Sequence, residues 1–338
     1  CCEVIGAPLS NSIQKNMSEF SKIWHFWYPN LYSEVSFSAK IVQGRETPKN
    51  NDSISTFSGG LDSAFINYLI AKGVDNPLNL KLKKAVLVHG ADVPLSDETG
   101  FDTIRAQIQE MADDLNIELI PVKTNVKESL IHWGHSHGSL FVGIMSFFSK
   151  TISHAVTSDY SYASFHFPHG FNPFTDKYFS SDEFEFHLEG IGYSRTERAA
   201  VIKNWKKALS NLHVCYEGID NAHNCGCCEK CIRTKLNFKA VGVDHLDCMP
   251  FDLNVSQLTK NNLVYEPITL SFYKDILSYG IKNRTLSQDW ILALNSQIKK
   301  WEKLTSPNRS IILNLYSVLI LIYRKLNLRY KFLLKNKP

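Results

Sequence analysis

Four short strand-like runs alternate with helix-like stretches between residues 53 and 160 of this 338-residue chain. The runs occupy residues 54–57, 85–90, 118–124 and 153–159. The helix-like stretches between them occupy residues 62–73, 102–116 and 139–149. Because alternating strands and helices favour a parallel sheet covered on both faces, the sequence predicts an α/β fold of the Rossmann-like kind.

Right-handed crossovers orient such strands in one direction, so their carboxyl ends share one edge of the sheet. The segments that line this edge are residues 58–63, 89–92, 124–137 and 158–162. Residues 163–194 are aromatic and polar without a clear period, which predicts an ordered loop over the same edge. Ligands of open α/β sheets bind along the carboxyl edge, so we expect the functional residues in these segments.

A loop of serine and glycine follows the first predicted strand. Its sequence, SGGLDS at residues 58–63, leads directly into the next helix. A loop of small residues at a helix start offers backbone N–H groups and the positive end of the helix dipole, which together bind phosphate. The hydroxyls of Ser58 and Ser63 add donors. An ordinary glycine turn is the alternative, and the loop matches neither the Walker loop nor the Gly-x-Gly-x-x-Gly pattern.

Five of the eight cysteines lie between residues 215 and 231, which is a local cluster and not the spread of a disulfide framework. Such a cluster points to metal binding in a reducing, cytoplasmic compartment. Thiolates at two-residue spacing wrap one tetrahedral Zn²⁺, and a thiolate from a preceding loop closes the site. The segment Cys-Gly-x-Cys-x-x-Cys resembles a known knuckle, and this match leaves out Cys227. The expected ligands of a structural Zn²⁺, in preference to an iron–sulfur cluster, are Cys215, Cys225, Cys228 and Cys231.

The loop at residues 58–63 resembles the pyrophosphate loop of the N-type ATP pyrophosphatases, or PP-loop superfamily, whose pattern is Ser-Gly-Gly-x-Asp-Ser. This superfamily includes asparagine synthetase, GMP synthetase, NAD synthetase, tRNA thiolases and 7-cyano-7-deazaguanine synthase. The resemblance implies a sheet of the adenine nucleotide alpha hydrolase type, with ATP and Mg²⁺ as cofactors and Asp62 as a partner of Mg²⁺. The loop residues that it assigns to ATP are Ser58, Gly59, Gly60, Leu61, Asp62 and Ser63.

A later segment, SRTE at residues 194–197, resembles the Ser-Lys-x-Glu segment of the same superfamily, in which a lysine contacts phosphate. Arg195 is therefore the candidate cation. An ion pair of Arg195 with Glu197 or another carboxylate is the alternative. The second strand of such enzymes ends near the adenosine, which nominates the neighbours of ATP in this chain: His89, Gly90 and Asp92.

The cysteine knuckle narrows the resemblance to the 7-cyano-7-deazaguanine synthases, which carry the same knuckle followed by an arginine, here Arg233. Residues from about 50 to 242 look like a branch of relatives of that synthase, in which HGADVPL, WGHSHG, SDYSYA and CGCCEKC have counterparts. The resemblance implies that substrate-binding residues end the fourth strand: Asp159, Tyr160, Ser161 and Tyr162.

Several histidines lie in or near the ligand edge. His135 and His137 are expected just ahead of a helix, where His137 is a candidate general base or phosphate contact. Helix capping is the alternative for His137. His166, His169 and His187 show no metal-like spacing and are interpreted as loop residues.

The chain divides into three predicted parts. They are an N-terminal segment at 1–50, a PP-loop domain at 51–242 with the knuckle at 215–231, and a helical extension at 243–338. The most apolar run, residues 311–322, is shorter than the ~20 residues of a membrane-spanning helix, so no membrane association is expected. The small net charge of +4 argues against nucleic acid as a partner.

Together these features predict a cytoplasmic, AMP-forming C–N ligase. By resemblance it adenylates a carboxylate, of a 7-deazaguanine in the first instance, and passes the acyl group to ammonia or an amine, including a protein amine. Relatives of this kind occur in antiviral and natural-product operons, and the chain is compatible with a homodimer. Two alternatives stay open. A tRNA-modifying thiolase requires a cysteine at the ligand edge, whereas a non-catalytic partner protein binds the nucleotide without releasing pyrophosphate.

Overall fold

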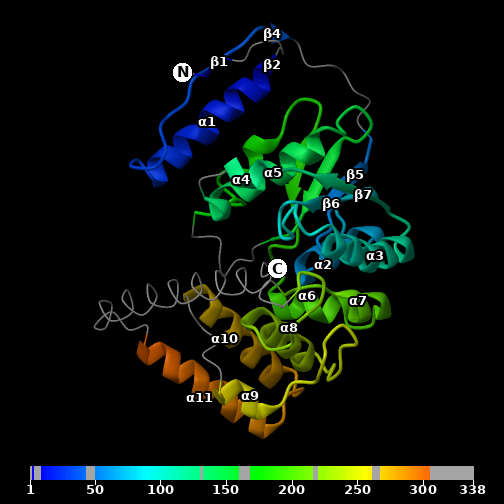
Figure 1. Ribbon diagram of the computed structural model, residues 1–338. Helices are drawn as coiled ribbons and strands as arrows, with labels where there is room; N and C mark the ends of the chain where they lie inside the picture. The colour runs from blue at the N-terminus through cyan, green and yellow to red at the C-terminus, as the bar shows by residue number, and fades with distance from the viewer. Residues whose placement is uncertain are drawn as a thin grey trace, which may run out of the picture. The chain divides into compact units, whose positions relative to one another are not determined.

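The computed structural model describes residues 2–3, 9–42, 50–129, 132–159, 168–215, 220–260 and 267–304. The chain forms two compact units, Cys1–Asp252 and Leu253–Pro338. Figure 1 shows the elements of both units along the chain. The first unit contains the sheet and every candidate site residue, and the second is built from helices.

A five-stranded sheet forms the centre of the first unit. Its strands run in the order β7-β6-β5-β8-β9, and every neighbouring pair is parallel. Their bounds are β5 Asp52–Thr56, β6 Lys81–His89, β7 Glu118–Lys123, β8 His154–Thr157 and β9 Glu185–Leu188. The predicted parallel α/β sheet is therefore confirmed, with its switch of direction between β5 and β8.

The fifth strand, β9, is absent from the sequence prediction, which treats residues 163–194 as a loop. β9 is only four residues long and lies at the edge of the sheet, where His154 pairs with Glu185 and Thr157 with Leu188. Its residues Glu-Phe-His-Leu bury only Phe186 fully, so they show no apolar run. A 3₁₀ helix, η1 Asp176–Phe179, precedes it.

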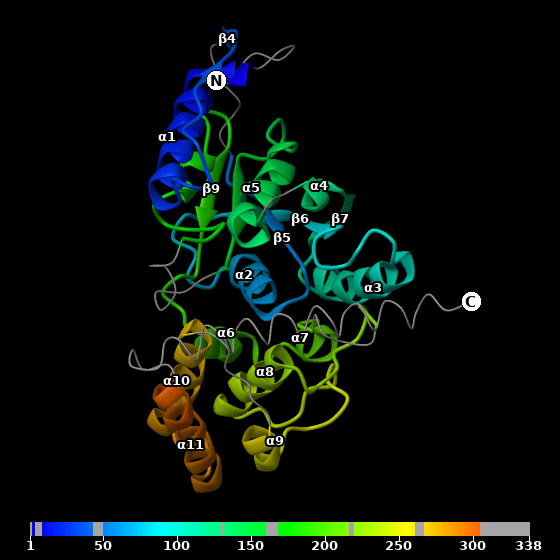
Figure 2. The same cartoon turned by 60° about the vertical axis from the view of Figure 1, so that its left-hand side comes forward.

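Helices cover both faces of this sheet (Figure 1, Figure 2). Leu61–Ala71 (α2) and Glu98–Asp114 (α3) lie on one face, and Val126–Ser129 (α4) and Trp133–Ser146 (α5) lie on the other. A buried cluster joins α5 to the strands and to the segment before β9, and its members include Ile54, Val86, Leu140, Phe171 and Phe186. Burial of these side chains holds the loops at the strand ends in place.

The start of α5 differs from the sequence prediction. The helix begins at Trp133, so His135 and His137 lie within its first turns and not ahead of it. Gly134 and Gly138 hide the helical pattern there. At Gly138 a Cβ atom would lie 1.9 Å from the carbonyl oxygen of Gly170, so glycine lets the two backbones approach closely.

The predicted helix at 195–209 is two helices. Arg195–Ile202 (α6) and Lys206–Asn211 (α7) are separated by residues 203–205. Ser194 and Glu197 form a capping box at the start of α6, with each side chain accepting from the backbone N–H of the other. Glu229–Ala240 (α8) ends near Gly242, whose φ of +88° closes the helix as expected.

The N-terminal segment contains one long helix, Asn11–Trp27 (α1), and four two-residue strands. These strands are β1 Cys2–Glu3, β2 Leu9–Ser10, β3 Phe37–Ser38 and β4 Ile41–Val42, in the parallel pairs β1 with β3 and β2 with β4. The side-chain amide of Asn16 donates to the carbonyl of Ser180 at 2.8 Å. The Tyr32 hydroxyl lies 2.8 Å from Nδ1 of His135. These contacts attach the segment to α5 and to the residues before β9.

The second unit consists, in its described part, of α9 Val255–Lys260, α10 Pro267–Lys282 and α11 Gln288–Leu304. Ile276 of α10 and Leu294 of α11 are fully buried, and Lys274 pairs with Glu302 at 2.6 Å. The apolar run at 311–322 and the basic C-terminal residues lie outside the described residues. Among the described helices, none has both the length and the apolar character needed to cross a bilayer.

Candidate functional site

The serine-glycine loop connects β5 to α2 as the sequence predicts. Gly59 has a φ of +82°, a conformation that glycine adopts without strain, and a Cβ atom there would lie 3.2 Å from Cδ1 of Ile108. Gly60 is the N-cap of α2 with a φ of −71°. The first turn of a helix leaves backbone N–H groups without partners inside the helix, so this turn presents donors to an anion.

Neighbouring segments fix the conformation of the loop. The amide of Phe57 donates to the carbonyl of Val86, and the amide of His213 donates to the carbonyl of Gly59, both at 2.9 Å. The Ser63 hydroxyl donates to the carbonyl of Gly60 at 3.0 Å and lies 3.3 Å from the hydroxyl of Ser58. The loop is thereby anchored from both sides.

Two arginines of α6 share the carboxylate of Asp62. Nη1 of Arg195 lies 2.6 Å from one carboxylate oxygen and Nη1 of Arg198 lies 2.8 Å from the other. Arg198 is 1% exposed and also donates to the carbonyls of Asp159 and Gly190, at 2.9 and 3.1 Å. One buried guanidinium therefore connects α2 with the residues that follow β8 and β9.

Arg195 forms its ion pair with Asp62, which the sequence does not reveal. Glu197 accepts a hydrogen bond in the capping box instead. The Nε of Arg195 is buried and has no hydrogen-bond partner among the described residues. Arg198 was not singled out from the sequence, although its position three residues after Arg195 puts both on one helix face.

Further cations come from α8. Arg233 pairs with Glu229 at 2.8 Å, and both side chains are buried. Burial lowers the pKa of Lys230, and the charges of Arg195 and Arg233 lower it further, against the opposing effect of Asp92. Burial is also the main cause of a lowered pKa at Arg195, which the carboxylate of Asp62 partly offsets.

These interactions bring four cations and three carboxylates together beside the loop: Arg195, Arg198, Lys230 and Arg233 with Asp62, Asp92 and Glu229. The excess is positive, and the N-terminal end of α2 adds to it. Burial is the largest cause of the lowered pKa values of Arg195 and Lys230, and neighbouring cations lower both further, so a bound anion would relieve part of this cost. The arrangement fits a phosphate-binding site.

The residues after β6 take different positions. His89 is fully buried, stacks on Phe101 with ring centroids 4.2 Å apart, and its Nε2 lies 2.9 Å from the carbonyl oxygen of Pro94. Its side chain supports the turn in which it lies. Gly90 has a φ of +100°, and a Cβ atom there would lie 1.9 Å from the carbonyl oxygen of Thr124. Asp92 is exposed and belongs to the charge group around Lys230.

A second group of polar side chains surrounds Asp159 at the end of β8. One of its carboxylate oxygens lies 3.4 Å from Nε2 of His137 and 3.3 Å from Nδ1 of His169. Burial raises the pKa of Asp159, but hydrogen bonds from both histidines outweigh this effect and hold the pKa below its ordinary value. Tyr160, Ser161, Tyr162 and His166 lie outside the described residues.

His169 lies in a loop, as the sequence predicts, but it also contacts Asp159. The distance of 32 residues between His137 and His169 hides their meeting, which depends on a backbone hydrogen bond from Gly170 to Gly134 of 2.8 Å. His187 was also placed in a loop, but it lies in β9. Glycines beside histidines in both segments were the available signal for this close approach.

The four predicted cysteines meet in the structure. The Sγ atoms of Cys215 and Cys228 are 3.8 Å apart, and those of Cys225 and Cys231 are 4.0 Å apart. All four lie within 4.8 Å of one another, whereas Cys227 is exposed and outside the group. Thiolates around one tetrahedral ion at about 2.3 Å are roughly 3.8 Å apart, so the cluster fits a metal.

Asn224 ties the knuckle to the rest of the unit. Its side-chain oxygen accepts from the amides of Val214 and Cys215, at 2.9 and 3.2 Å. Its side-chain nitrogen donates to the carbonyls of Leu212 and Cys248, at 2.7 and 2.9 Å. Because the amide of His213 in the same segment donates to the carbonyl of Gly59, one short segment contacts both the cysteine cluster and the serine-glycine loop.

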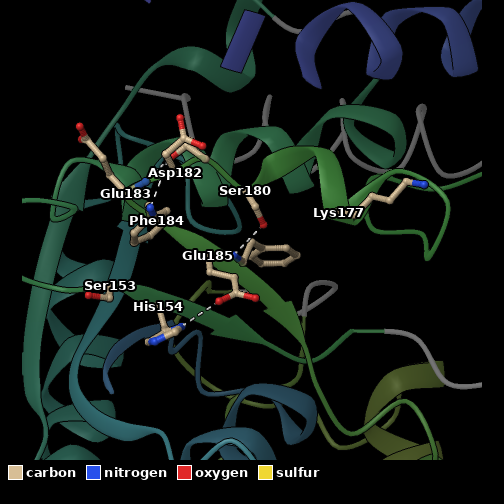
Figure 3. A pocket seen from close by; sticks show the side chains of 10 residues that line it. Ser153, His154, Lys177, Ser180, Asp182, Glu183, Phe184 and Glu185 are labelled. Atoms are coloured by element: carbon tan, nitrogen blue, oxygen red, sulfur yellow. Dashed lines mark hydrogen bonds and ion pairs between the residues drawn. The ribbon is translucent and has the colours of Figure 1, made fainter. Parts of the chain in front are cut away.

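A pocket of about 640 Å³ lies elsewhere, at the amino ends of β8 and β9 (Figure 3). His154 and Glu185 point toward each other in it, and Nδ1 of His154 lies 3.0 Å from Nε2 of His187. Lys177 and Ser180 to Phe186 line other parts. The candidate residues of the carboxyl edge do not line this pocket.

Comparisons of the chain with models of known protein families, with curated proteins and with solved structures found no match.

Proposed function

We propose that the protein is an ATP-dependent ligase of the PP-loop kind, which forms AMP and pyrophosphate as it activates a carboxylate. One observation carries the proposal. The serine-glycine loop at the start of α2 lies beside a group of mostly buried cations, of which Arg195 and Arg198 contact Asp62 directly. Such a surplus of buried positive charge at a helix N-terminus suits a polyphosphate better than a neutral ligand.

The chemistry of adenylation makes use of these groups. A carboxylate oxygen of the substrate attacks the α-phosphorus of ATP, and the bond between the α-phosphorus and the bridging oxygen to the β-phosphorus breaks. The leaving pyrophosphate gains negative charge as it departs, so donors and cations fixed around it lower the barrier. The loop amides, the hydroxyls of Ser58 and Ser63, and the side chain of Arg195 are the groups proposed for this role. Mg²⁺ bound with ATP would neutralise further charge.

Asp62 has two proposed tasks. Its carboxylate orients Arg195 and Arg198, whose nitrogens lie 2.6 and 2.8 Å away. Its position as the second residue of α2 also suits a partner of Mg²⁺, as the resemblance implies. A bound polyphosphate would compete with the carboxylate for Arg195, whose buried Nε has no hydrogen-bond partner among the described residues.

The proposed second step transfers the acyl group. The nitrogen of ammonia or of an amine attacks the acyl carbon, the bond to AMP breaks, and the nitrogen loses a proton to a base. The resemblance to 7-cyano-7-deazaguanine synthases nominates a 7-deazaguanine carboxylate as substrate and an amide or a conjugate as product. A nitrile requires a second ATP, which adenylates the amide oxygen so that this oxygen leaves with AMP. In this proposal the four cysteines hold a structural Zn²⁺, because four thiolates leave no position open on the ion.

The thiolase alternative requires a reactive cysteine at the ligand edge. Among the cysteines whose side chains are described, Cys227 and Cys248 are not in the metal cluster. Cys227 lies 3.7 Å from Cys225, and Cys248 accepts from Asn224, so both belong to the knuckle region. Burial raises the pKa of Cys248 to about 12, which suppresses the nucleophilic thiolate. These observations favour amide formation over sulfur transfer.

The test is to incubate the full chain with ATP, Mg²⁺ and 7-carboxy-7-deazaguanine, with and without ammonium, and to follow AMP by chromatography. We expect AMP that depends on the carboxylate, and we expect Arg195→Ala to reduce its rate by about 100-fold or more. The exposed Lys206 of α7 provides the control, since Lys206→Ala removes a cation without touching the site. Nucleotide binding without AMP release would favour the non-catalytic alternative.

A further inference from the structure

We propose that His137, Asp159 and His169 form a second metal site, which takes a divalent cation of the zinc type. The three donor atoms are Nε2 of His137, Oδ2 of Asp159 and Nδ1 of His169, and all lie within 4.8 Å of one another. The inference rests on this ligand geometry and is independent of the proposed ATP chemistry.

Three separate elements deliver the ligands. His137 lies in the second turn of α5, Asp159 follows β8, and His169 precedes Gly170. The backbone hydrogen bond from Gly170 to Gly134 and the tight approach of Gly138 to Gly170 hold the segment of His169 against α5. The imidazoles of His137 and His169 meet edge to face, with centroids 4.5 Å apart. The site is therefore set by packing and not by a local sequence motif.

The distances from Asp159 to the two histidines suit ligands of one ion better than strong, charged hydrogen bonds. The contacts of Asp159 with His137 and His169 measure 3.4 and 3.3 Å. Hydrogen bonds between a charged nitrogen and a carboxylate are shorter, at about 2.7 to 2.9 Å. Ligand atoms that share one ion at about 2.1 Å lie roughly 3.0 to 3.4 Å apart, in octahedral or tetrahedral geometry. The observed separations of 3.4 and 3.3 Å fit ligand atoms that share one ion.

The other nitrogen of His137 supports the same interpretation. Its Nδ1 lies 3.1 Å from the carbonyl oxygen of Trp133, which only accepts hydrogen bonds. Nδ1 of His137 therefore carries a proton, which leaves Nε2, the nitrogen that faces Asp159, as the atom that would bind an ion. Histidines that bind metals characteristically donate their second N–H to a carbonyl or a carboxylate in this way.

A second trio, His154, Glu185 and His187, provides an internal comparison. Its two histidine nitrogens are 3.0 Å apart, which is a normal hydrogen bond, while the carboxylate of Glu185 lies 3.7 and 3.9 Å from them. This trio fits a hydrogen-bonded histidine pair with a loosely placed carboxylate. It serves as the matched control.

The donor set indicates the class of ion. Two imidazoles and one carboxylate suit Zn²⁺, Co²⁺ or Fe²⁺ and disfavour Mg²⁺ and Ca²⁺, which prefer oxygen ligands. Three protein ligands leave at least one position open for an oxygen or nitrogen of a small ligand. Arg198 binds the carbonyl of Asp159 and the carboxylate of Asp62, so the ion would lie next to the cation group.

The experiment counts zinc in the full chain, purified with zinc present and freed of loose metal by gel filtration. We expect a second zinc ion per chain beyond that of the cysteine cluster. His169→Ala and Asp159→Asn should each remove it, with a loss of affinity beyond the roughly 10- to 100-fold that an outer-shell change causes. His187→Ala should leave the count unchanged. Calorimetric titration of zinc into protein with a filled cysteine cluster gives the affinity.

The His169→Ala variant is expected to fold, because the His169 side chain is 45% exposed and its removal opens no cavity in the core. Retention of the cysteine-bound zinc confirms that each variant is folded. The same zinc count in wild type and His169→Ala would overturn the inference, as would loss of the second ion in His187→Ala. Wild-type protein that holds only one zinc per chain would also overturn the inference, and AMP formation by that protein would leave the proposed function standing.

Discussion

At the scale of residues, the two loop glycines have different reasons to be glycine. Adjacent glycines after a strand predict a positive φ, and Gly59 alone has it, at +82°. Gly60 has a φ of −71°, which any residue can adopt. The nearest atom to a Cβ at Gly60 would be the hydroxyl of Ser58, at 3.7 Å. Under the proposed function, the second glycine lets a ligand approach the backbone closely.

This difference predicts opposite results for two alanine substitutions. Gly59→Ala should destabilise the protein by roughly 1 to 2 kcal/mol, since alanine would be held in the left-handed region against Ile108. Gly60→Ala should cost less than about 1 kcal/mol, the size of a modest N-cap effect. It should nevertheless weaken ATP binding, because its methyl group would lie between the loop amides and the phosphate.

Denaturant unfolding gives the two stabilities, and calorimetry with ATP and Mg²⁺ gives the affinities. A Gly60→Ala variant with unchanged stability and unchanged ATP affinity would show that the loop does not hold the nucleotide.

At the scale of elements, the sequence predicted four of the five strands and the helices between them, because each of these strands contains an apolar run. The sequence prediction missed β9, whose four residues lie at an edge of the sheet. It also began the helix too late and placed the first turns of α5 ahead of it, because Gly134 and Gly138 interrupt the helical pattern. The cysteine cluster was predictable because its spacing is local. The meeting of His137 with His169 was not, since packing alone brings them together.

The hydrogen bonds of Asn224 predict that this residue stabilises the cysteine knuckle. Asn224→Ala removes four hydrogen bonds to the backbone and leaves buried N–H and C=O groups without partners. We expect a loss of roughly 2 to 4 kcal/mol of stability and faster release of the cysteine-bound metal to a chelator. Asn283→Ala, which loses one hydrogen bond at an exposed position, should change neither. Equal metal release from both variants would contradict the role given to Asn224.

The pairing of β8 with β9 predicts a pH dependence. Burial lowers the pKa of His187 below its ordinary value of 6.5, His154 lowers it further, and Glu185 opposes the shift. Above that value His187 is neutral in the folded and unfolded chain alike. As the pH falls below 6.5 the unfolded chain takes up the proton first, so stability should decline, by less than about 1.4 kcal/mol per pH unit.

Unfolding measured between pH 8 and about pH 5 checks this sign, with His187→Gln expected to flatten the decline. His245 should show the opposite pH dependence and provides a control. A hydrogen bond to Asp252 raises its pKa, so its contribution is present below pH 6.5 and is lost as the pH rises. A wild-type curve that His187→Gln leaves unchanged would rule out this histidine pair as the source.

At the scale of the whole molecule, parts of the first unit that are far apart in the sequence contact one another. The first turn of α8 contains Cys231 of the cysteine cluster and the cation Lys230, and the segment before Cys215 binds the carbonyl of Gly59 through the amide of His213. The sequence reveals neither of these two contacts, because both depend on which loops meet at the carboxyl edge of the sheet. The parallel sheet could be predicted, whereas its strand order and the arginine pair on Asp62 could not.

The central claim is that the loop at the start of α2 holds the β- and γ-phosphates of ATP. A crystal structure of the protein with Mg²⁺ and an ATP analogue that cannot be cleaved between the α- and β-phosphates tests it directly. We predict these phosphates within hydrogen-bond distance of the backbone amides of residues 59–63, with Arg195 turned toward them. Phosphates bound away from these amides, or a loop still closed by the pairing of Arg195 with Asp62 while the nucleotide lies elsewhere, would contradict the account.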